Sequence, residues 1–499
     1  MTSLWLDRGK TFGSDTFEAG NSYDTVVAGA GLTGLVTALL LARSGQRVLV
    51  VEARFPGAVT TGNTTAKVSV LQGTVLSALA RQYSQKQVGA YVEANREGQS
   101  WLLRYLDEHH AQYQRRDAYT YATTAQGTEL LREELIAATT AGLEVEYVRD
   151  AHLPFPIHGA LVLTDQAQIN PMDILDTLLV DVRARGGSVV GGTRLRNVSG
   201  SGPLAVHTDR GIVNANNVVL ATGIPVLDRG LYFTKLKPLR SYAAALELPP
   251  GITPPPGMYL SAEEPTHSMR DYEADGRRLL LVGGHGHQAG RTGSEKFHLS
   301  GLLDWAVAHF PGAVATHTWS AQDYQATNLM PFFGKLPRGR GHIFFGTGYN
   351  KWGMTNAVAA ALGISADILG GHLRWATTIH HRVTAPSGAL TAVALNAGVA
   401  ARLATDWGKM AAGKSTTGGP VTADGDAKVY RDGARPAAVS TVDGTTCRLS
   451  AVCTHLGGIV HWNDSELTWD CPLHGSRFSP DGKLLEGPAT KDLPRLEQG

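Results

Sequence analysis

Cysteine is scarce in this sequence of 499 residues: there are three, and Cys447, Cys453 and Cys471 all lie after position 446. Three cysteines cannot supply a disulfide framework for such a chain. An excess of charge is lacking too, since 45 basic residues stand against 44 acidic ones. Because a phosphate backbone is bound by net positive charge or a basic stripe, we expect no nucleic-acid partner.

Long hydrophobic runs are also missing. The uncharged stretch that most resembles a membrane span, residues 25–42, contains three glycines and lies between Asp24 and Arg43. It is marginal in length for a bilayer and is better interpreted as a buried strand followed by a helix, so we expect no membrane span. The first 22 residues show no apolar core and no small-residue cleavage pattern. We therefore expect no secretory signal and a cytoplasmic protein.

What the sequence does contain is typical of a large folded protein. At about 100–200 residues per domain, the length predicts two to four domains. Hydrophobic residues make up 43% and charged residues 18%, which excludes a disordered chain. Glycine is abundant, with 58 residues and no G-X-Y period. This surplus predicts many tight turns and close backbone approaches, of the kind that cofactor loops use.

The chain opens with one βαβ pattern, formed by a strand at 23–29, a helix at 30–45 and a strand at 46–54. Short strands are expected over 188–222, and the later runs RRLLLVGG and GHIFFGTG are also of β type. Further helices are expected at 85–110, 128–140, after Asn170-Pro171, near 296–309, at 353–370 and at 388–411. Residues 412–425 are rich in Gly, Ser and Thr and predict a flexible linker. The remainder, 426–499, shows short β runs and no helix pattern.

The last segment carries two pairs of metal-ligand residues. Cys453 and His455 form a C-x-H pair, fifteen residues follow, and Cys471 and His474 form a C-x-x-H pair. A tetrahedral zinc site is the plain alternative, but zinc fingers place paired cysteines on one arm and paired histidines on the other. One Cys and one His on each arm resembles the Rieske [2Fe–2S] family, and the resemblance covers essentially all of 426–499. It implies that Cys453 and Cys471 bind one iron and that His455 and His474 bind the other.

Departures from the Rieske pattern predict the properties of this cluster. Many Rieske proteins join the two ligand loops by a disulfide, but the corresponding positions here are Gly458 and Leu473. Ser476 could donate a hydrogen bond to a sulfur, whereas Phe478 stands where high-potential members have Tyr. We therefore expect a low to intermediate reduction potential. Cys447 is expected to be a small apolar strand residue with no redox role.

A dinucleotide fingerprint lies between the first strand and the first helix. Gly29-Ala30-Gly31-Leu32-Thr33-Gly34 has the G-x-G-x-x-G spacing, and Glu52 ends the second strand 18 residues beyond the last glycine. Such glycines allow a tight turn, backbone approach to a pyrophosphate and close helix–strand packing, while the acidic residue accepts from a ribose hydroxyl. FAD and NAD would satisfy this pattern equally well.

Three later segments resemble the FAD-dependent family of D-amino-acid oxidase, glycine oxidase and sarcosine oxidase. They are TTGNTTAKVSV at 60–70, NNVVLATGIPV at 216–226 and LMPFFGKLPRGRGHIFFGTGYNKWGMTNAVAAALG at 329–363. The resemblance spans roughly 22–410 and implies FAD as the cofactor. It implies that FAD is bound by Gly29, Ala30, Gly31, Leu32, Thr33, Gly34, Glu52, Ala53, Thr64, Thr65, Ala66, Lys67, Leu195, Thr222, Gly223, Gly348, Lys351, Trp352, Gly353, Met354 and Thr355. No Cys precedes position 447 and no His lies in 53–70, so we expect the FAD to be non-covalent.

The two resemblances together imply an α/β Rossmann-like FAD-binding domain with an inserted α+β substrate domain, followed by an all-β Rieske domain. The oxidoreductase is expected over 1–411, the linker over 412–425 and the Rieske domain over 426–499. Within the oxidoreductase we expect FAD-binding parts at about 22–80, 165–238 and 326–411, and substrate parts at about 81–164 and 239–325.

The expected reaction is the oxidation of a small amine or amino acid, with single electrons passing between the cluster and a carrier protein or O2. Lys67 and Lys351 are expected near the flavin by their motif positions, and Arg240 could pair a substrate carboxylate with Tyr242 nearby. His285 and His287 follow a predicted strand and could reach the site.

Two other functions stay open. A Rieske or flavin oxygenase acting on a small metabolite would need, in the Rieske case, a separate iron site, and neither the Asp107–His110 cluster nor His380-His381 has persuasive spacing for one. A non-catalytic electron-transfer flavoprotein would have no open pocket over the flavin.

Overall fold

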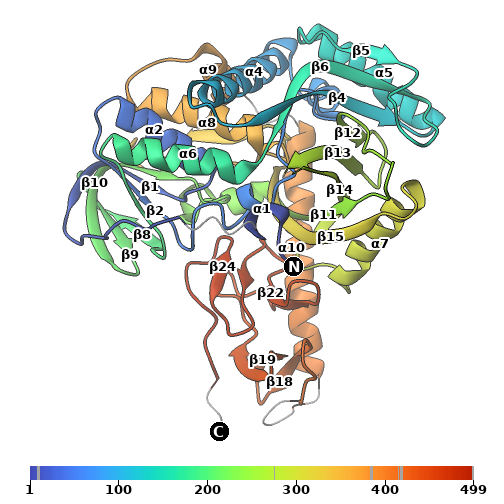
Figure 1. Ribbon diagram of the computed structural model, residues 1–499. Coiled ribbons are helices and arrows are strands. Elements are labelled where there is room, and N and C mark those ends of the chain that lie inside the picture. Colours follow the sequence, from blue (N-terminus) through green and yellow to red (C-terminus); the bar gives the residue numbers. More distant parts are fainter. Residues whose placement is uncertain (8–11, 275, 383–385, 414, 416–419, 497–499) are drawn as a thin grey trace.

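The structure is a computed structural model that describes residues 1–7, 12–274, 276–382, 386–413, 415 and 420–496 (Figure 1). Its first layer is an eight-stranded sheet in the order β16-β17-β10-β1-β2-β7, to which β9 and β8 are added beside β10. The strands are β1 (Ser22–Ala28), β2 (Val48–Val51), β7 (Ser188–Val190), β8 (Leu195–Ser199), β9 (Leu204–Thr208), β10 (Gly211–Leu220), β16 (Phe332–Lys335) and β17 (Ile343–Thr347).

Alternation along the central strand β1 separates the two faces of this sheet. Val27 packs into a core shared with α2 (Leu32–Arg43), α6 (Pro171–Ala184) and α8 (Gly353–Ile368). Val26 and Ala28 point the other way, into a second core under β8 and β9. Successive side chains of a strand point to opposite faces, which is why this continuous apolar run buries both of its sides.

The second layer is a nine-stranded sheet in the order β15-β11-β14-β13-β12-β4-β6-β3, with β5 beside β6. The chain enters it twice, between β2 and β7 and again between β10 and β16. Its strands are β3 (Lys67–Val68), β4 (Tyr113–Ala122), β5 (Glu146–Val148), β6 (Gly159–Ile169), β11 (Leu236–Glu247), β12 (Met258–Ser261), β13 (His267–Ala274), β14 (Arg277–Gln288) and β15 (Val314–Ala326). Its associated helices are α3 (Val75–Ala80), α4 (Gln85–Glu108), α5 (Ala125–Thr140) and α7 (Glu295–His309).

The C-terminal domain lies below these two layers in Figure 1 and is built from two small antiparallel sheets. The three-stranded sheet contains β18 (Ala427–Asp432), β19 (Arg435–Val442) and β20 (Thr445–Ser450). The four-stranded sheet contains β21 (His461–Asn463), β22 (Thr468–Asp470), β23 (Arg477–Phe478) and β24 (Leu484–Glu486). Leu449, Trp469 and Phe478 are buried in the core of this domain, together with Cys453 and Cys471.

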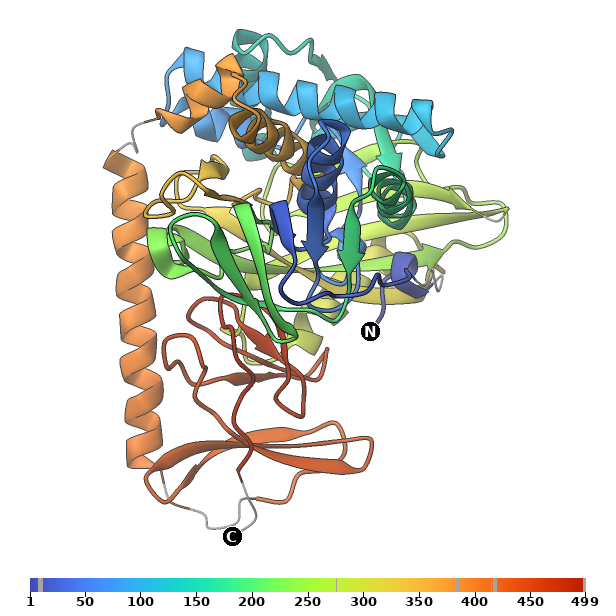
Figure 2. The same ribbon diagram turned by 90° about the vertical axis from the view of Figure 1, so that its left-hand side faces the viewer.

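A long helix, α10 (Pro386–Ala412), connects the large domain to the C-terminal domain and runs alongside the latter (Figure 2). Val399, Leu403 and Met410 pack against the C-terminal core, while Leu390 and Val393 are 69% and 66% exposed. By length and composition, Ser387–Ala412 is the one helix in the described chain that could cross a membrane. A solitary helix of this kind is weak evidence for a span, because soluble proteins contain similar helices.

The expected helices and the opening βαβ unit are confirmed. Asn170 caps α6 as its sequence position suggested, since the side chain accepts a hydrogen bond from the Met172 amide and Pro171 opens the helix. The pattern gave no indication of the long strands β4, β6 and β15 or of α9 (Arg374–His380). Part of the expected linker, at 414 and 416–419, lies outside the described residues.

Candidate functional site

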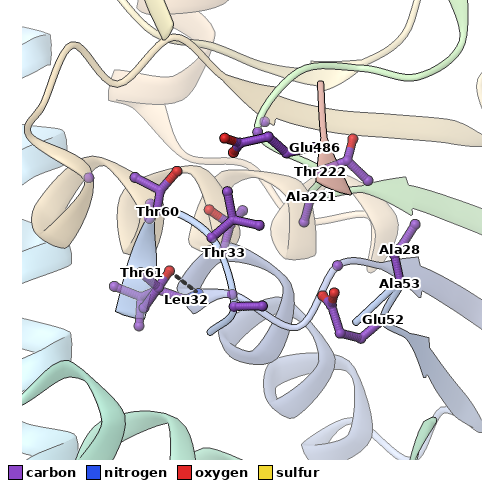
Figure 3. Close-up of a pocket in the computed structure, with 18 of the residues that line it drawn as sticks. Ala28, Leu32, Thr33, Glu52, Ala53, Thr60, Thr61, Ala221, Thr222 and Glu486 are labelled. Atoms are coloured by element: carbon purple, nitrogen blue, oxygen red, sulfur yellow. Dashed lines mark hydrogen bonds between the residues drawn. The ribbon is translucent and has the colours of Figure 1, made fainter. Parts of the chain in front are cut away.

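A deep pocket opens where β1, β10 and β17 of the first sheet end (Figure 3). Gly29 has φ +106°, and a Cβ on it would lie 2.3 Å from the Ala221 carbonyl oxygen, so only glycine fits this turn. A Cβ on Gly34 would meet the Gly29 carbonyl, which shows how closely α2 packs on β1. Helix α2 begins at Leu32 with Gly31 as its N-cap, and the Leu32 N–H donates to Thr61 Oγ1 at 3.3 Å. The other N–H groups of this first turn can bind a pyrophosphate.

Glu52 closes the nucleotide end of this pocket. One carboxylate oxygen accepts from the Ala30 amide at 2.8 Å, and the other accepts from the Arg54 amide at 2.9 Å. Burial raises the pKa of Glu52, and the two backbone hydrogen bonds oppose that rise. Each oxygen keeps a second lone pair, so the carboxylate can still accept from a ribose hydroxyl.

Two thirds of the expected FAD-binding residues line this pocket. Those that do are Gly29, Gly31, Leu32, Thr33, Glu52, Ala53, Thr64, Leu195, Thr222, Gly223, Gly348, Lys351, Gly353 and Met354. Seven others, Ala30, Gly34, Thr65, Ala66, Lys67, Trp352 and Thr355, lie beside the pocket without lining it. Thr355, for example, is buried in a polar network in which its hydroxyl donates to Asn95 at 2.6 Å. The described lining contains no Cys and no His.

Several lining residues carried no recognisable sequence signal. Asp323 and Tyr324 lie on β15, and Tyr349 precedes α8 with its hydroxyl 3.0 Å from that of Thr33. The Asp323 carboxylate accepts a hydrogen bond from the Lys351 amide. Burial raises the pKa of Asp323 and lowers that of the Lys351 amine, so the pocket holds an acid and a base that are both poorly solvated.

The second sheet packs closely against Lys351 at Gly286. A Cβ on Gly286 would lie 2.8 Å from Ser241 Oγ and 3.2 Å from Lys351 Nζ, so the strand must be bare at this point. Lys67 is partly buried, and its amine donates a hydrogen bond to Thr65 Oγ1 at 3.3 Å. Burial and the nearby Arg270 guanidinium lower the pKa of Lys67 to about 7.

Arg270 itself was missed in the sequence. It is 1% exposed and donates to the Ile169 carbonyl at 3.2 Å, but its Nε and Nη1 have no hydrogen-bond partner among the described residues. The Arg270 guanidinium lies 5.3 Å from the centroids of the Trp5 and Tyr272 rings, and among the described residues no carboxylate forms an ion pair with Lys67 or Arg270. A buried guanidinium is costly unless an anion accompanies it.

The roles expected for Arg240, Tyr242 and His285 need correction, because these side chains lie on the other face of the second sheet. The Tyr242 hydroxyl is 3.0 Å from His287 Nε2, and His285 Nε2 is 3.2 Å from His267 Nε2. A Cβ on Gly301 of α7 would lie 2.7 Å from the His285 ring, which places that histidine under the helix. Arg240 is fully buried between the two domains. None of these three residues lines the FAD pocket.

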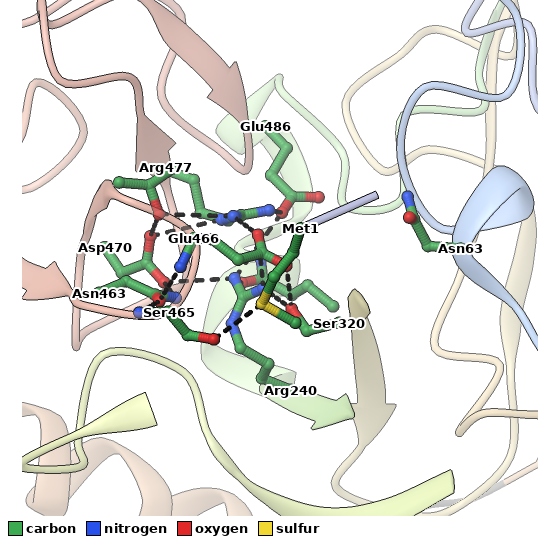
Figure 4. Close-up of polar contacts among 12 residues, drawn as sticks. Met1, Asn63, Arg240, Ser320, Asn463, Ser465, Glu466, Asp470, Arg477 and Glu486 are labelled. Carbon is green, nitrogen blue, oxygen red and sulfur yellow. Dashed lines mark hydrogen bonds and ion pairs between the residues drawn. The ribbon is translucent and has the colours of Figure 1, made fainter. Parts of the chain in front are cut away.

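Arg240 instead anchors the C-terminal domain (Figure 4). Its guanidinium lies 3.2 Å from the Asp470 carboxylate and 3.6 Å from that of Glu466, and it donates to Ser320 at 2.6 Å. Arg477 completes the cluster by pairing with Glu466, Asp470 and Glu486. Although burial opposes ionisation, Arg477 and Arg240 lower the pKa of Glu466 to about 2. A substrate carboxylate cannot reach a guanidinium that is fully buried and ion-paired in this way.

The four expected metal ligands converge at the end of the C-terminal domain that faces the large domain. Two loops hold them with the same backbone hydrogen bonds. Cys453 N donates to Gly458 O at 2.8 Å and Gly457 N donates to Cys453 O at 3.1 Å. The second loop repeats both bonds and both distances, from Cys471 N to Ser476 O and from Gly475 N to Cys471 O. Gly457 and Gly475 have φ +73° and +76°, which explains a glycine at this place in each loop.

The ligand side chains are arranged as a pair of sulfurs and a pair of imidazoles. The sulfurs of Cys453 and Cys471 are in hydrogen-bond contact, which lowers the pKa of Cys453 to about 7. The rings of His455 and His474 have centroids 5.2 Å apart, and buried His474 Nδ1 has no partner among the described residues. In the described chain no three His, Cys, Asp or Glu surround one point closely enough for a single ion. Two pairs fit a cluster of two irons better than one zinc.

The surroundings of the ligands agree with the departures noted in the sequence. A Cβ on Gly458 would lie 2.7 Å from the Leu473 side chain, so these two residues touch where other Rieske proteins have a disulfide. The Ser476 hydroxyl hydrogen-bonds the Cys453 sulfur and accepts from the Ala489 amide at 3.1 Å. Phe478 is completely buried and offers no hydroxyl. Cys447 lies on β20, apart from the ligands.

The C-terminal domain also completes the FAD pocket. Leu485, Glu486, Gly487 and Ala489 line that pocket together with residues of the large domain, and Figure 3 draws Glu486 with them. Arg194, another lining residue, donates to the Leu484 carbonyl at 2.7 Å. On the ligand side, Phe233 of the large domain contacts both His455 and His474 edge-on, with centroids 5.0 and 4.9 Å away. Both candidate sites therefore meet at one interface.

Comparison with known proteins agrees with this geometry. Residues 24–366 match the DAO family of FAD dependent oxidoreductases, and residues 418–497 match the Rieske [2Fe-2S] domain. The chain is 31% identical over 485 residues to YhfW of Bacillus subtilis (strain 168), named as a Rieske 2Fe-2S iron-sulfur protein, covering 95% of this chain and 93% of that one. Over 45 residues it is 51% identical to a cytochrome b6-f complex iron-sulfur subunit of Synechococcus sp. (strain JA-3-3Ab), which is 9% of this chain and 26% of that protein.

Solved structures show the same fold in the large domain. Glycine oxidase from Geobacillus kaustophilus superposes with a TM-score of 0.60 at 16% identity, over 71% of this chain and 96% of that one. L-Amino acid deaminase from Proteus myxofaciens gives 0.59 at 16% identity, over 74% and 94%. The expected fold and cofactors are thereby confirmed: FAD in the large domain and a [2Fe–2S] cluster in the C-terminal domain. The chain belongs to the DAO family of FAD dependent oxidoreductases and carries a C-terminal Rieske domain.

Proposed function

We propose that this oxidoreductase oxidises a small amine or amino-acid-like substrate and exchanges single electrons with a partner through its Rieske domain. FAD accepts two electrons with a hydride, whereas a [2Fe–2S] cluster passes one electron at a time. Oxidation of a C–N bond to an imine releases two electrons and two protons, and water then hydrolyses the imine. The electrons leave one by one to a carrier protein or to O2.

The observation that carries this proposal is the group of buried basic side chains beside the FAD pocket. Arg270 and Lys351 are poorly solvated cations, and the Lys67 amine lies close enough to Arg270 for its pKa to be lowered by that guanidinium. A small substrate with a carboxylate would complete this arrangement, because a buried cation needs a partner. The large domain also shares its fold with proteins named as glycine oxidase and L-amino acid deaminase.

The lysines suit the proton transfers that such an oxidation requires. Hydride leaves the carbon of an amine only when its nitrogen is neutral, so a base must accept the ammonium proton. With a pKa of about 7, Lys67 is partly neutral at physiological pH and can accept it. Lys351 lies in the pocket itself and can bind the electron-rich edge of the cofactor.

Anaerobic titration tests the substrate class. Purified protein is mixed with amino acids and with the matching amines that lack the carboxylate, and flavin absorbance is followed by stopped flow. We expect bleaching by members of this panel, fastest with a carboxylate present, and marked slowing in Lys351→Met. If no amine or amino acid bleaches the flavin, the proposal fails and the non-catalytic alternative gains support.

A further inference from the structure

Gln322, on β15, connects the two cofactor sites and is itself buried, at 2% exposure. Its amide makes three hydrogen bonds. The oxygen accepts from Arg240 at 3.1 Å, and the nitrogen donates to the Tyr324 hydroxyl at 3.1 Å and to the Gly475 carbonyl at 2.7 Å. The Arg240 donor fixes which end of the amide is oxygen. One side chain therefore contacts both domains.

On the FAD side, the path continues through Tyr324. This residue lines the FAD pocket, and its ring would lie 3.5 Å from a Cβ on Gly223, which also lines it. Burial raises the pKa of the Tyr324 hydroxyl, so it stays protonated and accepts from Gln322 through its lone pairs. The main-chain carbonyl of Gln322 accepts from the hydroxyl of Thr60, a further lining residue, at 2.8 Å.

On the cluster side, Gly475 is the neighbour of the ligand His474 and belongs to the second ligand loop. Gly475 packs tightly against the large domain, since a Cβ on it would lie 2.7 Å from Pro238 and 2.9 Å from Gln322 Nε2. Its φ of +76° and this contact both require glycine. The loop that holds His474 is therefore fixed to β11 and β15 by direct contact.

We propose that Tyr324 and Gln322 are positioning residues that form the route of electron transfer between the FAD pocket and the His474 side of the cluster. The inference rests on the proposed function, because it assumes that electrons pass between the two centres. Each transfer moves one electron, and the two electrons of one substrate leave in two successive transfers to the carrier protein or O2. The hydrogen bonds at Gln322 hold the two ends of this route in contact, which a swinging Rieske domain would not do.

The experiment uses the full-length holoprotein and needs no substrate. A photoreduced deazaflavin delivers electrons to the protein anaerobically after a laser flash, and the absorbance of flavin and cluster is followed separately. Gln322→Met keeps the side-chain volume but removes all three hydrogen bonds, and Tyr324→Phe removes one hydroxyl. Tyr259→Phe is the matched control, since Tyr259 is a buried tyrosine whose hydroxyl donates to Pro256 O at 3.1 Å, outside the route.

We expect rapid equilibration between the centres in the parent protein and in Tyr259→Phe. Gln322→Met should slow this equilibration at least about tenfold, because losing about one hydrogen bond's net free energy at the barrier changes a rate by about that factor. Tyr324→Phe should slow it less. Gln322→Met should also change the EPR spectrum of the reduced cluster, because the Gly475 carbonyl loses its donor. Midpoint potentials of both centres, measured in each variant, separate a change in driving force from a change in the route.

The possible failures are distinguishable. If the parent protein shows no equilibration, the electron relay of the proposed function fails and the route fails with it. If the parent equilibrates and both variants match it, the relay stands but Gln322 and Tyr324 are not its route. If Gln322→Met loses its FAD, the test depends on Tyr324→Phe alone. An equilibration rate in Tyr324→Phe equal to that of the parent then overturns the inference.

Discussion

At the scale of single residues, Lys67 gives the sharpest pH prediction. Its pKa falls from 10.5 to about 7 because burial disfavours the ammonium and the Arg270 guanidinium repels it. The neutral amine, which can accept a proton, therefore predominates above pH 7. We expect the limiting rate of flavin reduction to rise with pH, with an apparent pKa near 7. In Lys67→Met this rise in rate with pH should be absent.

Stopped-flow reduction at saturating substrate measures this profile between pH 5.5 and 9. Lys86→Met is the control, because Lys86 is an exposed lysine at the start of α4 and does not line the FAD pocket. If the rate of flavin reduction rises with pH in Lys67→Met as it does in the parent, the titration belongs to another group, such as the substrate ammonium itself.

Ser476 gives a second prediction at this scale, which concerns the cluster. Its hydroxyl hydrogen-bonds the Cys453 sulfur, and such a bond stabilises the more negative, reduced state of a cluster. Ser476→Ala should lower the midpoint potential by about 60 mV if that bond is worth about 1.4 kcal/mol more in the reduced state. Protein-film voltammetry measures the shift. Ser479→Ala, which removes a hydroxyl that bonds to Asp481 instead, should leave the potential unchanged.

The parent potential itself should lie low or intermediate within the Rieske range of about −150 to +300 mV. The reason is that Phe478 supplies no hydroxyl and that Gly458 and Leu473 supply no disulfide. A midpoint near the top of that range would show that other groups set the potential.

At the scale of secondary-structure elements, the junction of β11 with the Rieske strands depends on Arg240. Arg240→Met would leave Glu466, Asp470 and Glu486 with Arg477 as the only guanidinium of the cluster. Breaking a buried pair in this way costs about 3–5 kcal/mol. We expect the Rieske domain to unfold or detach before the large domain, giving two transitions in calorimetry where the parent gives one.

Arg278→Met provides the matched control for this substitution. Arg278 lies on β14 in the same sheet, but its pair with Glu273 is exposed, at 3.3 Å. Exposed pairs contribute about 0–1 kcal/mol, so this variant should melt like the parent. Identical melting of both variants would show that the buried cluster does not hold the domains together.

Arg240 also shows where prediction from sequence ended. The fingerprint glycines, Glu52 and the four cluster ligands could be recognised because each pattern lies within a short stretch of chain. Which face of a strand points to a cofactor depends on register with distant strands, and here Arg240 faces Asp470, 230 positions later. On β11 and β14 the residues that face Lys351, which lines the FAD pocket, are instead Ser241 and Gly286. Arg270, Asp323 and Gln322 were missed for the same reason, since their roles arise only from tertiary contacts.

Helix α7 illustrates the same dependence at the level of an element. Its position was predicted, but its N-terminus is completed by the Rieske domain. Asp464 accepts from the Glu295 amide at 2.8 Å, from the Lys296 amide at 3.0 Å and from the Ser294 hydroxyl at 2.6 Å. A carboxylate at a helix N-terminus satisfies free N–H groups and interacts favourably with the helix dipole. The two domains thus stabilise each other's elements as well as each other's sites.

At the scale of the whole molecule, the FAD pocket and the Rieske domain are expected to depend on each other. The lining residues Leu485, Glu486, Gly487 and Ala489 begin within β24, which pairs with β23, the strand that follows the second ligand loop. Anything that loosens this domain should therefore weaken FAD binding, and bound FAD should in turn stabilise the domain by the same free energy.

A variant without the cluster tests this coupling. Cys453→Ser removes a ligand, so the metal-dependent stability of the Rieske domain is lost, and FAD should be released more readily on dialysis. Cys447→Ser is the matched control, since Cys447 lies outside the ligand set, and it should keep parent amounts of both cofactors. Iron is measured by mass spectrometry, and FAD by fluorescence after acid precipitation, which should also release the flavin because the described pocket lining offers no Cys or His for covalent attachment.

The parent protein should contain about two irons per chain, as a single [2Fe–2S] cluster requires. About three would indicate a separate mononuclear site and favour the oxygenase alternative. If Cys453→Ser loses its iron but holds FAD as tightly as the parent, the two domains are independent. The Rieske segment would then border the FAD pocket without contributing to cofactor affinity.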